Sequence, residues 1–246
     1  MLKLKQLYRA NYAGENIVSQ LTLAGGEWNP ETEYVPNAVT NVHSTSQAVA
    51  IGNGNSRLNF DLSHIARHRG GLLGVDRLQS YGCNALYRDF TPDFLIVTGD
   101  DMAEEVANSG YINSNIVYTT ADITLQYPGK FYMVPQNIQL DAGALAAYMA
   151  CFDGHSKVFL LGYDHYQDYE PVNNVYSDTN AYPPGTARDN GFSFVLNLED
   201  VVRTYPDVEF VRVMPLDTWN MHDRFKSLLN FRQIDYRAFV LEADIG

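Results

Sequence analysis

The chain lacks the features of membrane-spanning and nucleic-acid-binding proteins. No apolar run in its 246 residues reaches the roughly 18 residues that a helix needs to cross a bilayer. Residues 1–5 are basic, but no apolar segment of a signal peptide follows them. Only 17 Lys and Arg stand against 29 Asp and Glu, whereas proteins that grip nucleic-acid phosphates carry a basic face. We therefore expect no membrane span and no nucleic-acid partner.

Cysteine is equally scarce. Cys83 and Cys151 are the two cysteines, and neither belongs to a Cys-x-x-Cys pair, which excludes zinc ribbons and redox motifs. Their apolar neighbours predict buried thiols, and we expect a cytoplasmic location, because a reducing cytoplasm fits such thiols best. The six histidines have no spacing that predicts a metal site. No Gly-x-Ser-x-Gly elbow is present, which argues against a Ser-His-Asp hydrolase.

What the chain does contain is an alternation of short apolar segments and helical patterns. The composition, 46% hydrophobic and 19% charged, is that of a globular protein. Strands are predicted at 47–51, 78–82, 93–99, 116–118, 130–134, 157–161 and 207–213. Helices are predicted at 61–68, 100–108, 143–152, 192–205 and 222–229, and Asp141 is expected to cap the third of them. The alternation predicts an α/β fold: a Rossmann-like three-layer domain with a mostly parallel central sheet.

Residues 1–46 have no steady periodicity and predict an irregular N-terminal extension or β-arm before a Rossmann-like domain over residues 47–246. The alternation at residues 17–23 is typical of a β-hairpin. The extension is either a strap packed on the domain or a surface for a partner. That partner would be another protein or a second copy of this chain.

Polar loops follow four of the predicted strands, and ligands of parallel sheets bind beyond the carboxyl ends of strands. These loops are residues 52–56, 83–84, 98–101 and 162–166. In the first loop, glycines allow backbone amides to approach an anion, while Asn and Ser supply neutral donors. A plain strand–helix turn is the alternative interpretation of this first loop. For Asp100 or Asp101, the alternative is that it caps the following helix. We expect the four loops to converge on one nucleotide site.

The loop at 162–166 carries the side chains best suited to catalysis. His165 is a candidate general acid or base near neutral pH, and Asp164 precedes it. Tyr166 is suited to donate to a phosphate without adding charge. The alternative to a catalytic role is that this loop is the end of a strand with polar residues on the surface. Residues 167–190 predict a long loop of the kind that often serves function.

Several segments resemble, in order and spacing, two related families. They are Ile51 to Leu58 with its Gly-Asn-Gly-x-Ser-x-Leu pattern, Asp61-Leu62, Gly82 to Tyr87, Asp141-Ala142-Gly143 and Val158 to Tyr166. One family comprises bacterial sialyltransferases that use CMP-sialic acid, and the other comprises 6-hydroxymethylpterin pyrophosphokinase-like proteins of Rossmann type. The resemblance covers roughly residues 47–215, and the whole chain is similar to bacteriophage accessory proteins of this type.

The resemblance implies a nucleotide site, with Asn53 and Ser56 at the phosphate or ribose and Asn84 at the cytidine or sugar. Gly143 matches the glycine of the Thr-Ser-Gly turn of the sialyltransferases, and the hydroxyls of Tyr166 and Tyr176 would donate to the CMP phosphate. Such hydroxyls stabilise a leaving phosphate with little or no metal. The full set of predicted nucleotide-binding residues is Gly52, Asn53, Gly54, Asn55, Ser56, Asn84, Thr98, Gly99, Asp100, Gly143, Tyr166 and Tyr176.

The chain departs from the sialyltransferase pattern at three places. Asn55 stands where the family has Pro, and Ala142 stands where a phosphate-binding Ser is expected. Residues 186–193 lack the general-base His of the family. Asp189 and His165 are the candidate replacements, and with Asp164 they form the predicted catalytic set.

Three functions follow from these observations. The leading one is a glycosyltransferase-like enzyme that binds a CMP-type nucleotide-activated sugar and transfers the sugar to an acceptor hydroxyl. The second is a pyrophosphokinase-like enzyme acting on a small alcohol, in which Mg²⁺ would be held by Asp100, Asp101 and Asp164. The third is a non-catalytic phage structural or host-interaction protein that uses residues 1–46.

Overall fold

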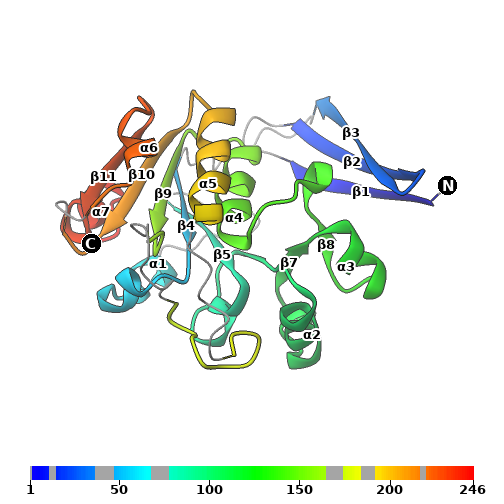
Figure 1. The fold of residues 1–246 in the computed structure, drawn as a ribbon, viewed down its shortest axis with the longest axis horizontal. Coiled ribbons are helices and arrows are strands. Elements are labelled where there is room, and N and C mark those ends of the chain that lie inside the picture. The colour runs from blue at the N-terminus through cyan, green and yellow to red at the C-terminus, as the bar shows by residue number, and fades with distance from the viewer. Residues whose placement is uncertain are drawn as a thin grey trace.

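Eight parallel strands form the central sheet of the computed structural model, and helices cover both of its faces (Figure 1). The structure describes residues 2–10, 15–36, 47–67, 78–164, 174–183, 192–216 and 220–246. The predicted α/β class with a parallel central sheet is confirmed. No helix in these ranges is long and apolar enough to cross a membrane.

Seven of the eight strands of the sheet overlap the predicted apolar segments, and β11 is the exception. They are β4 (Gln47–Ile51), β5 (Gln79–Cys83), β6 (Phe94–Ile96), β7 (Ile116–Thr119), β8 (Tyr132–Met133), β9 (Lys157–Leu161), β10 (Glu209–Met214) and β11 (Phe231–Asp235). The α-helices are α1 (Ser63–Arg67), α2 (Asp100–Ser109), α3 (Ala121–Gln126), α4 (Ala142–Phe152), α5 (Phe192–Thr204), α6 (Asp223–Lys226) and α7 (Tyr236–Glu242). The 3₁₀ helices are η1 (Asn55–Asn59), η2 (Asn84–Arg88), η3 (Tyr111–Asn113) and η4 (Pro135–Asn137).

Two apolar cores, one on each face of the sheet, hold the layers together. Helices α4 and α5 bury their side chains in the first core, against β4, β5, β6 and β9. Helices α2 and α7 contribute to the second core on the opposite face. Strand β4 is buried on both faces, as is usual for a strand inside a parallel sheet, and it appears in the sequence as a continuous apolar run.

The strand order places a topological switch point between β4 and β9. The order is β11-β10-β9-β4-β5-β6-β7-β8. From β4 the chain adds β5 to β8 on one side, then returns to place β9, β10 and β11 on the other side. Ligands of doubly wound sheets bind in the crevice at such a point, beyond the carboxyl ends of the strands.

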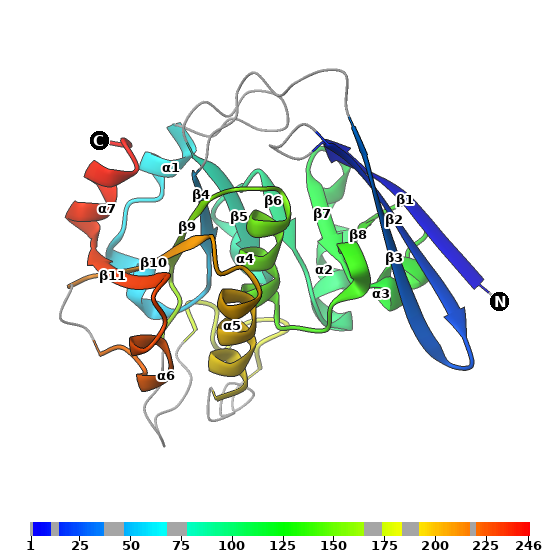
Figure 2. The same ribbon diagram turned by 90° about the horizontal axis from the view of Figure 1, so that it is seen from above.

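Where an irregular extension was expected, the N-terminal residues form a separate three-stranded antiparallel sheet of β1 (Leu2–Ala10), β2 (Glu15–Ala24) and β3 (Glu27–Pro36). Residues 17–23 lie within β2, which forms a hairpin with β3. Leu21 is fully buried against Ala121 and Met133, and the Trp28 indole donates to Asp122 at 3.1 Å. The small sheet therefore packs beside β8 and α3, at the edge of the domain away from β11 (Figure 2).

Two local predictions are wrong. Strand β11 follows β10 and pairs with it in parallel, whereas no strand was expected after residue 213. Its alternating polar side chains suit an edge strand, which has no second neighbour to exclude water. The expected cap of α2 by Asp100 or Asp101 is also incorrect, because both residues lie inside the first turn and Gly99 occupies the N-cap with a φ of 87°.

Candidate functional site

The four polar loops meet in one cavity of about 220 Å³ at the switch point. It lies beyond the carboxyl ends of β4, β5 and β9, between the strand-end loops and the start of α4. The lining residues are Gly52, Asn53, Gly54, Cys83, Asn84, Thr98, Asp141, Ala142, Gly143, Ala144, Gly162, Tyr163, Asp164, Asn174, Tyr182, Phe194 and Leu198.

The loop after β4 is bound tightly to the loop after β9. The amide of Gly52 donates to Leu161 O at 2.8 Å, and the amide of Gly54 donates to Gly162 O at 3.0 Å. The Ser56 amide donates to the Asp164 carboxylate at 3.0 Å, and the Ser56 hydroxyl bonds the same carboxylate. These three amides are satisfied within the protein, so the loop offers a ligand its Asn53 side chain rather than a ring of free amides.

Three neutral polar side chains meet inside the cavity. The Tyr182 hydroxyl bonds the amides of Asn53 and Asn84. Asn84 has a φ of 47°, and its Oδ1 accepts from the Thr98 amide at 3.0 Å. Asn53 Nδ2 donates to Cys83 O at 3.2 Å, while its Oδ1 is buried without a hydrogen-bond partner in the described part of the chain. A buried unpaired acceptor is costly and points to a ligand or water that donates to it.

Burial shifts the pKa values of several groups in the cavity wall. It raises the pKa of Tyr182 to about 12, so the hydroxyl keeps its proton and remains a donor at neutral pH. It likewise raises the pKa of Cys83 to about 12, which leaves a neutral, unreactive thiol. The wall therefore contributes neutral groups at these positions.

Asp141 connects the cavity to α4. Its Oδ1 accepts from the Ala144 amide at 3.0 Å, and its Oδ2 accepts from Asn197 of α5 at 2.9 Å. Burial raises the pKa of Asp141, although these hydrogen bonds oppose the shift. Gly143, in the same turn, accepts from the Tyr163 hydroxyl at 2.6 Å. The predicted capping of this helix by Asp141 is confirmed, and the carboxylate occupies the position that an external anion would take.

The walls of the cavity differ in charge and polarity. Asp141 and Asp164 are its charged residues, and no Lys or Arg among the described residues lines it. Phe194 and Leu198 of α5 form an apolar wall, and Phe194 is 41% exposed. The arrangement suits a ligand with one flat apolar face and a polar edge, whose own anionic group lies outside the deepest part.

A second hollow of about 330 Å³ adjoins the first and shares Asn84, Thr98 and Tyr182 with it. Its other described walls are Ala181 and the start of α2 with its N-cap Gly99, and they include Asp100 and Asp101. The part of the chain that the structure describes contains no cluster of three or more His, Cys, Asp or Glu side chains that could hold a metal ion.

Most of the predicted nucleotide-binding residues lie at these two hollows. Gly52, Asn53, Gly54, Asn84, Thr98, Gly143 and the predicted catalytic Asp164 line the cavity, and Thr98, Gly99 and Asp100 line the adjoining hollow. Asn55 is exposed outside the cavity, and Ser56 is buried behind it. His165, Tyr166 and Asp189 lie outside the described residues.

Tyr176 is buried away from the cavity. Its hydroxyl bonds Asp89 and accepts from Arg57 Nη2 at 2.9 Å. Tyr182, six residues further along the chain, is the tyrosine that enters the cavity. The sequence pattern did not single out Tyr182, because many tyrosines of this region stand in similar polar surroundings.

No family model, curated protein or solved structure matches the chain. The cavity and its neighbouring elements are therefore the basis for inferring a function.

Proposed function

We propose that this chain is a glycosyltransferase-like enzyme that binds a CMP-type nucleotide-activated sugar and transfers the sugar to an acceptor hydroxyl. The observation that carries the proposal is the cavity at the switch point, whose inner wall presents Asn53, Asn84 and Tyr182 as neutral polar groups. Crevices at this place in doubly wound sheets are the usual site of nucleotide binding.

The chemistry of the walls supports a nucleoside as the buried part of the ligand. The unpaired Asn53 Oδ1 requires a donor, which an exocyclic amine or a ribose hydroxyl supplies. Phe194 offers an apolar surface for the flat face of a base. Because Asp141 and Asp164 line the cavity and Asp100 and Asp101 line the adjoining hollow, the nucleotide phosphate fits best at the mouth, near the neutral Tyr182 hydroxyl.

The proposed transfer uses the same groups. The oxygen of the acceptor hydroxyl attacks the anomeric carbon, and the bond from that carbon to the phosphate oxygen breaks with its electron pair. The proton of the hydroxyl passes to a carboxylate, for which we propose Asp164, and the leaving phosphate accepts a hydrogen bond from Tyr182. A neutral donor aimed at developing charge stabilises it without the cost of reorganising solvent.

A second candidate, the Mg²⁺-dependent pyrophosphokinase-like function, is favoured by one observation. Asp100 and Asp101 line the hollow beside the cavity, where a triphosphate would lie if its nucleoside occupied the cavity. Carboxylates that hold Mg²⁺ between phosphates are the usual arrangement in phosphoryl transfer. Nucleotide binding that is strictly Mg²⁺-dependent would support this candidate over sugar transfer.

Isothermal titration of the full chain with CMP, UMP and ATP, each with and without Mg²⁺, tests the proposal. We expect CMP to bind without Mg²⁺, with a Kd between about 1 μM and 1 mM, the range of ordinary substrate affinities. Asn53→Ala should weaken CMP binding at least about tenfold, since a hydrogen bond to a buried acceptor is lost. Asn55→Ala, at an exposed position in the same loop, is the matched control and should leave the Kd for CMP unchanged.

The absence of binding to every nucleotide by a folded sample would overturn both enzymatic candidates. It would leave the non-catalytic interaction protein as the remaining function. Equal losses in Asn53→Ala and Asn55→Ala would show that the nucleotide binds elsewhere.

A further inference from the structure

Residues 174–183 form a strap across the edge of the cavity, and two of its residues, Asn174 and Tyr182, line the cavity. The strap is folded by short-range bonds, including Ser177 N to Asn174 O at 3.0 Å. One backbone bond joins it to the first loop, from Val175 N to Asn53 O at 2.8 Å. Such a short segment without a helix or strand of its own depends on side-chain anchors for its position.

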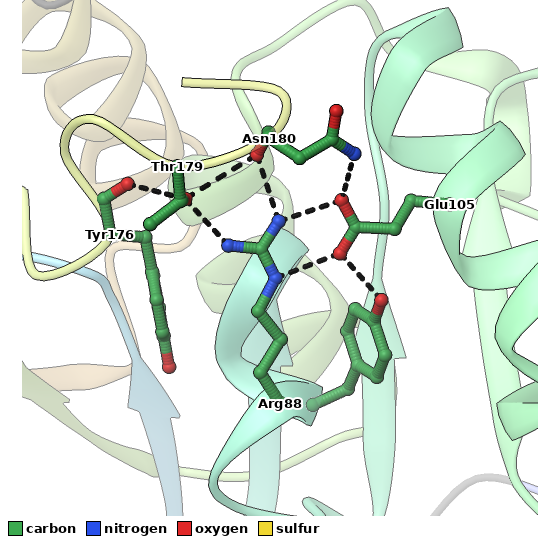
Figure 3. Close-up of polar contacts among 6 residues, drawn as sticks. Arg88, Glu105, Tyr176, Thr179 and Asn180 are labelled. Atoms are coloured by element: carbon green, nitrogen blue, oxygen red, sulfur yellow. Dashed lines mark hydrogen bonds and ion pairs between the residues drawn. The ribbon is translucent and has the colours of Figure 1, made fainter. Parts of the chain in front are cut away.

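One such anchor is the ion pair of Arg88 and Glu105 (Figure 3). Arg88 Nε and Nη2 donate to the two oxygens of Glu105, each at 2.7 Å. The same guanidinium donates from Nη1 to Thr179 Oγ1 at 2.7 Å and from Nη2 to Asn180 O at 2.8 Å. The Asn180 side-chain amide completes the network by donating to Glu105. The bidentate ion pair thus holds two consecutive strap residues, Thr179 and Asn180.

The anchor leads directly to the cavity. Tyr182 N donates to Thr179 O at 3.0 Å, so the residue held by Arg88 also holds the backbone of Tyr182. Arg88 ends the 3₁₀ helix η2, which begins at the cavity residue Asn84. Glu105 lies in the middle of α2, whose first turn lines the adjoining hollow. The ion pair therefore connects three walls of the site.

We propose that Arg88 and Glu105 are positioning residues that fix the strap so that the Tyr182 hydroxyl meets Asn53 and Asn84 in the binding-competent site. The proposal rests on the proposed function, because the ligand is the nucleotide of that site. A strap released from its anchor spends part of its time away from the cavity. The apparent affinity then falls by the fraction of molecules that remain competent.

The charge state of Glu105 agrees with this role. Although burial acts to raise it, hydrogen bonds from Arg88, Tyr87 and Asn180 lower the pKa of Glu105 to about 2. A depressed carboxylate pKa means that the anchor is fully present above the usual value of 4.5 and is lost as the pH falls toward about 2. The strap should stay anchored throughout the neutral range.

The test combines hydrogen exchange of the full chain with isothermal titration of CMP, for Glu105→Gln and Arg88→Met. We expect the Thr179 and Tyr182 amides to exchange about tenfold faster in both variants, with the amides of α4 unchanged, since local opening is what exchange reports. The Kd for CMP should rise about tenfold. Arg88→Lys keeps the charge but loses the bidentate geometry, so we expect an intermediate effect.

Arg232→Met is the matched control. Arg232 also bonds two carboxylates, of Glu209 and Glu242, but between β10, β11 and α7. Its loss should alter neither the exchange of the strap nor the Kd for CMP. This control separates the anchor from a general effect of removing an ion pair.

Each failure has a distinct signature. Unchanged strap exchange in folded Glu105→Gln overturns the anchor, whatever the nucleotide result. Faster exchange together with an unchanged Kd for CMP overturns the positioning role. If the unaltered protein binds no nucleotide, the proposed function fails, and with it the role of the anchor in binding.

Discussion

Gly52 shows how closely the two loops of the site approach each other. A Cβ added at this position would lie 2.6 Å from the backbone oxygen of Gly162. Gly162 itself has a φ of 76°, a conformation that favours glycine. The contact joins the ends of β4 and β9 at the switch point. Gly52 and Gly162 therefore allow the two loops of the cavity wall to pack against each other.

Gly52→Ala should therefore lower the free energy of unfolding by roughly 1–3 kcal/mol, because a backbone atom must move to make room. Urea unfolding followed by circular dichroism measures the change. Gly143→Ala is the contrasting variant, since its Cβ would meet Asp141 Oδ1 at 3.2 Å and would lie inside α4, where Ala is favoured over Gly. We expect it to be nearly neutral for stability. A loss in Gly143→Ala as large as that in Gly52→Ala would contradict this account.

Helix α4 is the element on which the cavity depends most directly. It is almost completely buried, its alanines allow close packing on the sheet, and Asp141 at its N-cap faces the cavity. Asp141 also accepts from Asn197, so one carboxylate joins α4 to α5.

Asp141→Ala should lower the free energy of unfolding by about 1 kcal/mol through the lost cap and should also weaken nucleotide binding. Asp235→Ala is the matched control, because Asp235 caps α7 in the same way, with Ala238 N at 2.7 Å, far from the cavity. It should cost similar stability and leave binding unchanged. Equal binding by both variants would exclude a role of Asp141 in the site.

The same helix predicts a pH effect. Burial raises the pKa of Asp141 above its usual value of 3.8. A carboxyl group whose pKa is raised in the folded state adds to the free energy of unfolding. This contribution is fully present below the usual pKa and is lost as the pH rises through the folded-state pKa. Asp141→Asn keeps an acceptor for the cap and removes the charge, so its unfolding free energy should lack this decrease. Parallel pH profiles for the two proteins would contradict the assignment.

At the scale of the whole molecule, the described residues form an α/β domain with a parallel central sheet and a small antiparallel sheet. None of the described residues that line the cavity belongs to β1, β2 or β3. The two parts meet where β2 and β3 contact η4 and where Leu21 is buried against Ala121 and Met133.

Removal of residues 1–44 should therefore leave a domain that folds cooperatively and binds CMP with unchanged affinity. The melting temperature should fall, since burial of Leu21 contributes up to about 3 kcal/mol. Differential scanning calorimetry and titration with CMP measure the two effects. Loss of cooperative unfolding would show that the small sheet is part of the folding unit, and loss of CMP binding alone would place it in the site.

The sequence by itself determined the α/β class, the order of most strands and helices, the capping of α4 by Asp141 and the four polar loops. These features depend on local periodicity and on hydrogen bonds between near neighbours, which a single chain segment already encodes. The pairing of β9 with β4, which creates the switch point, depends on contacts between residues more than a hundred positions apart. Only the tertiary structure decided it.

Which side chains line the site was also determined by the tertiary structure. Tyr182 lines the cavity, whereas the Tyr176 hydroxyl is held away from it by Asp89 and Arg57. Ser56 was expected at the ligand, but the Asp164 carboxylate takes both of its donors. Sequence pattern identifies groups that are able to bind a ligand. Which of them remain free to do so depends on the partners that folding brings beside them.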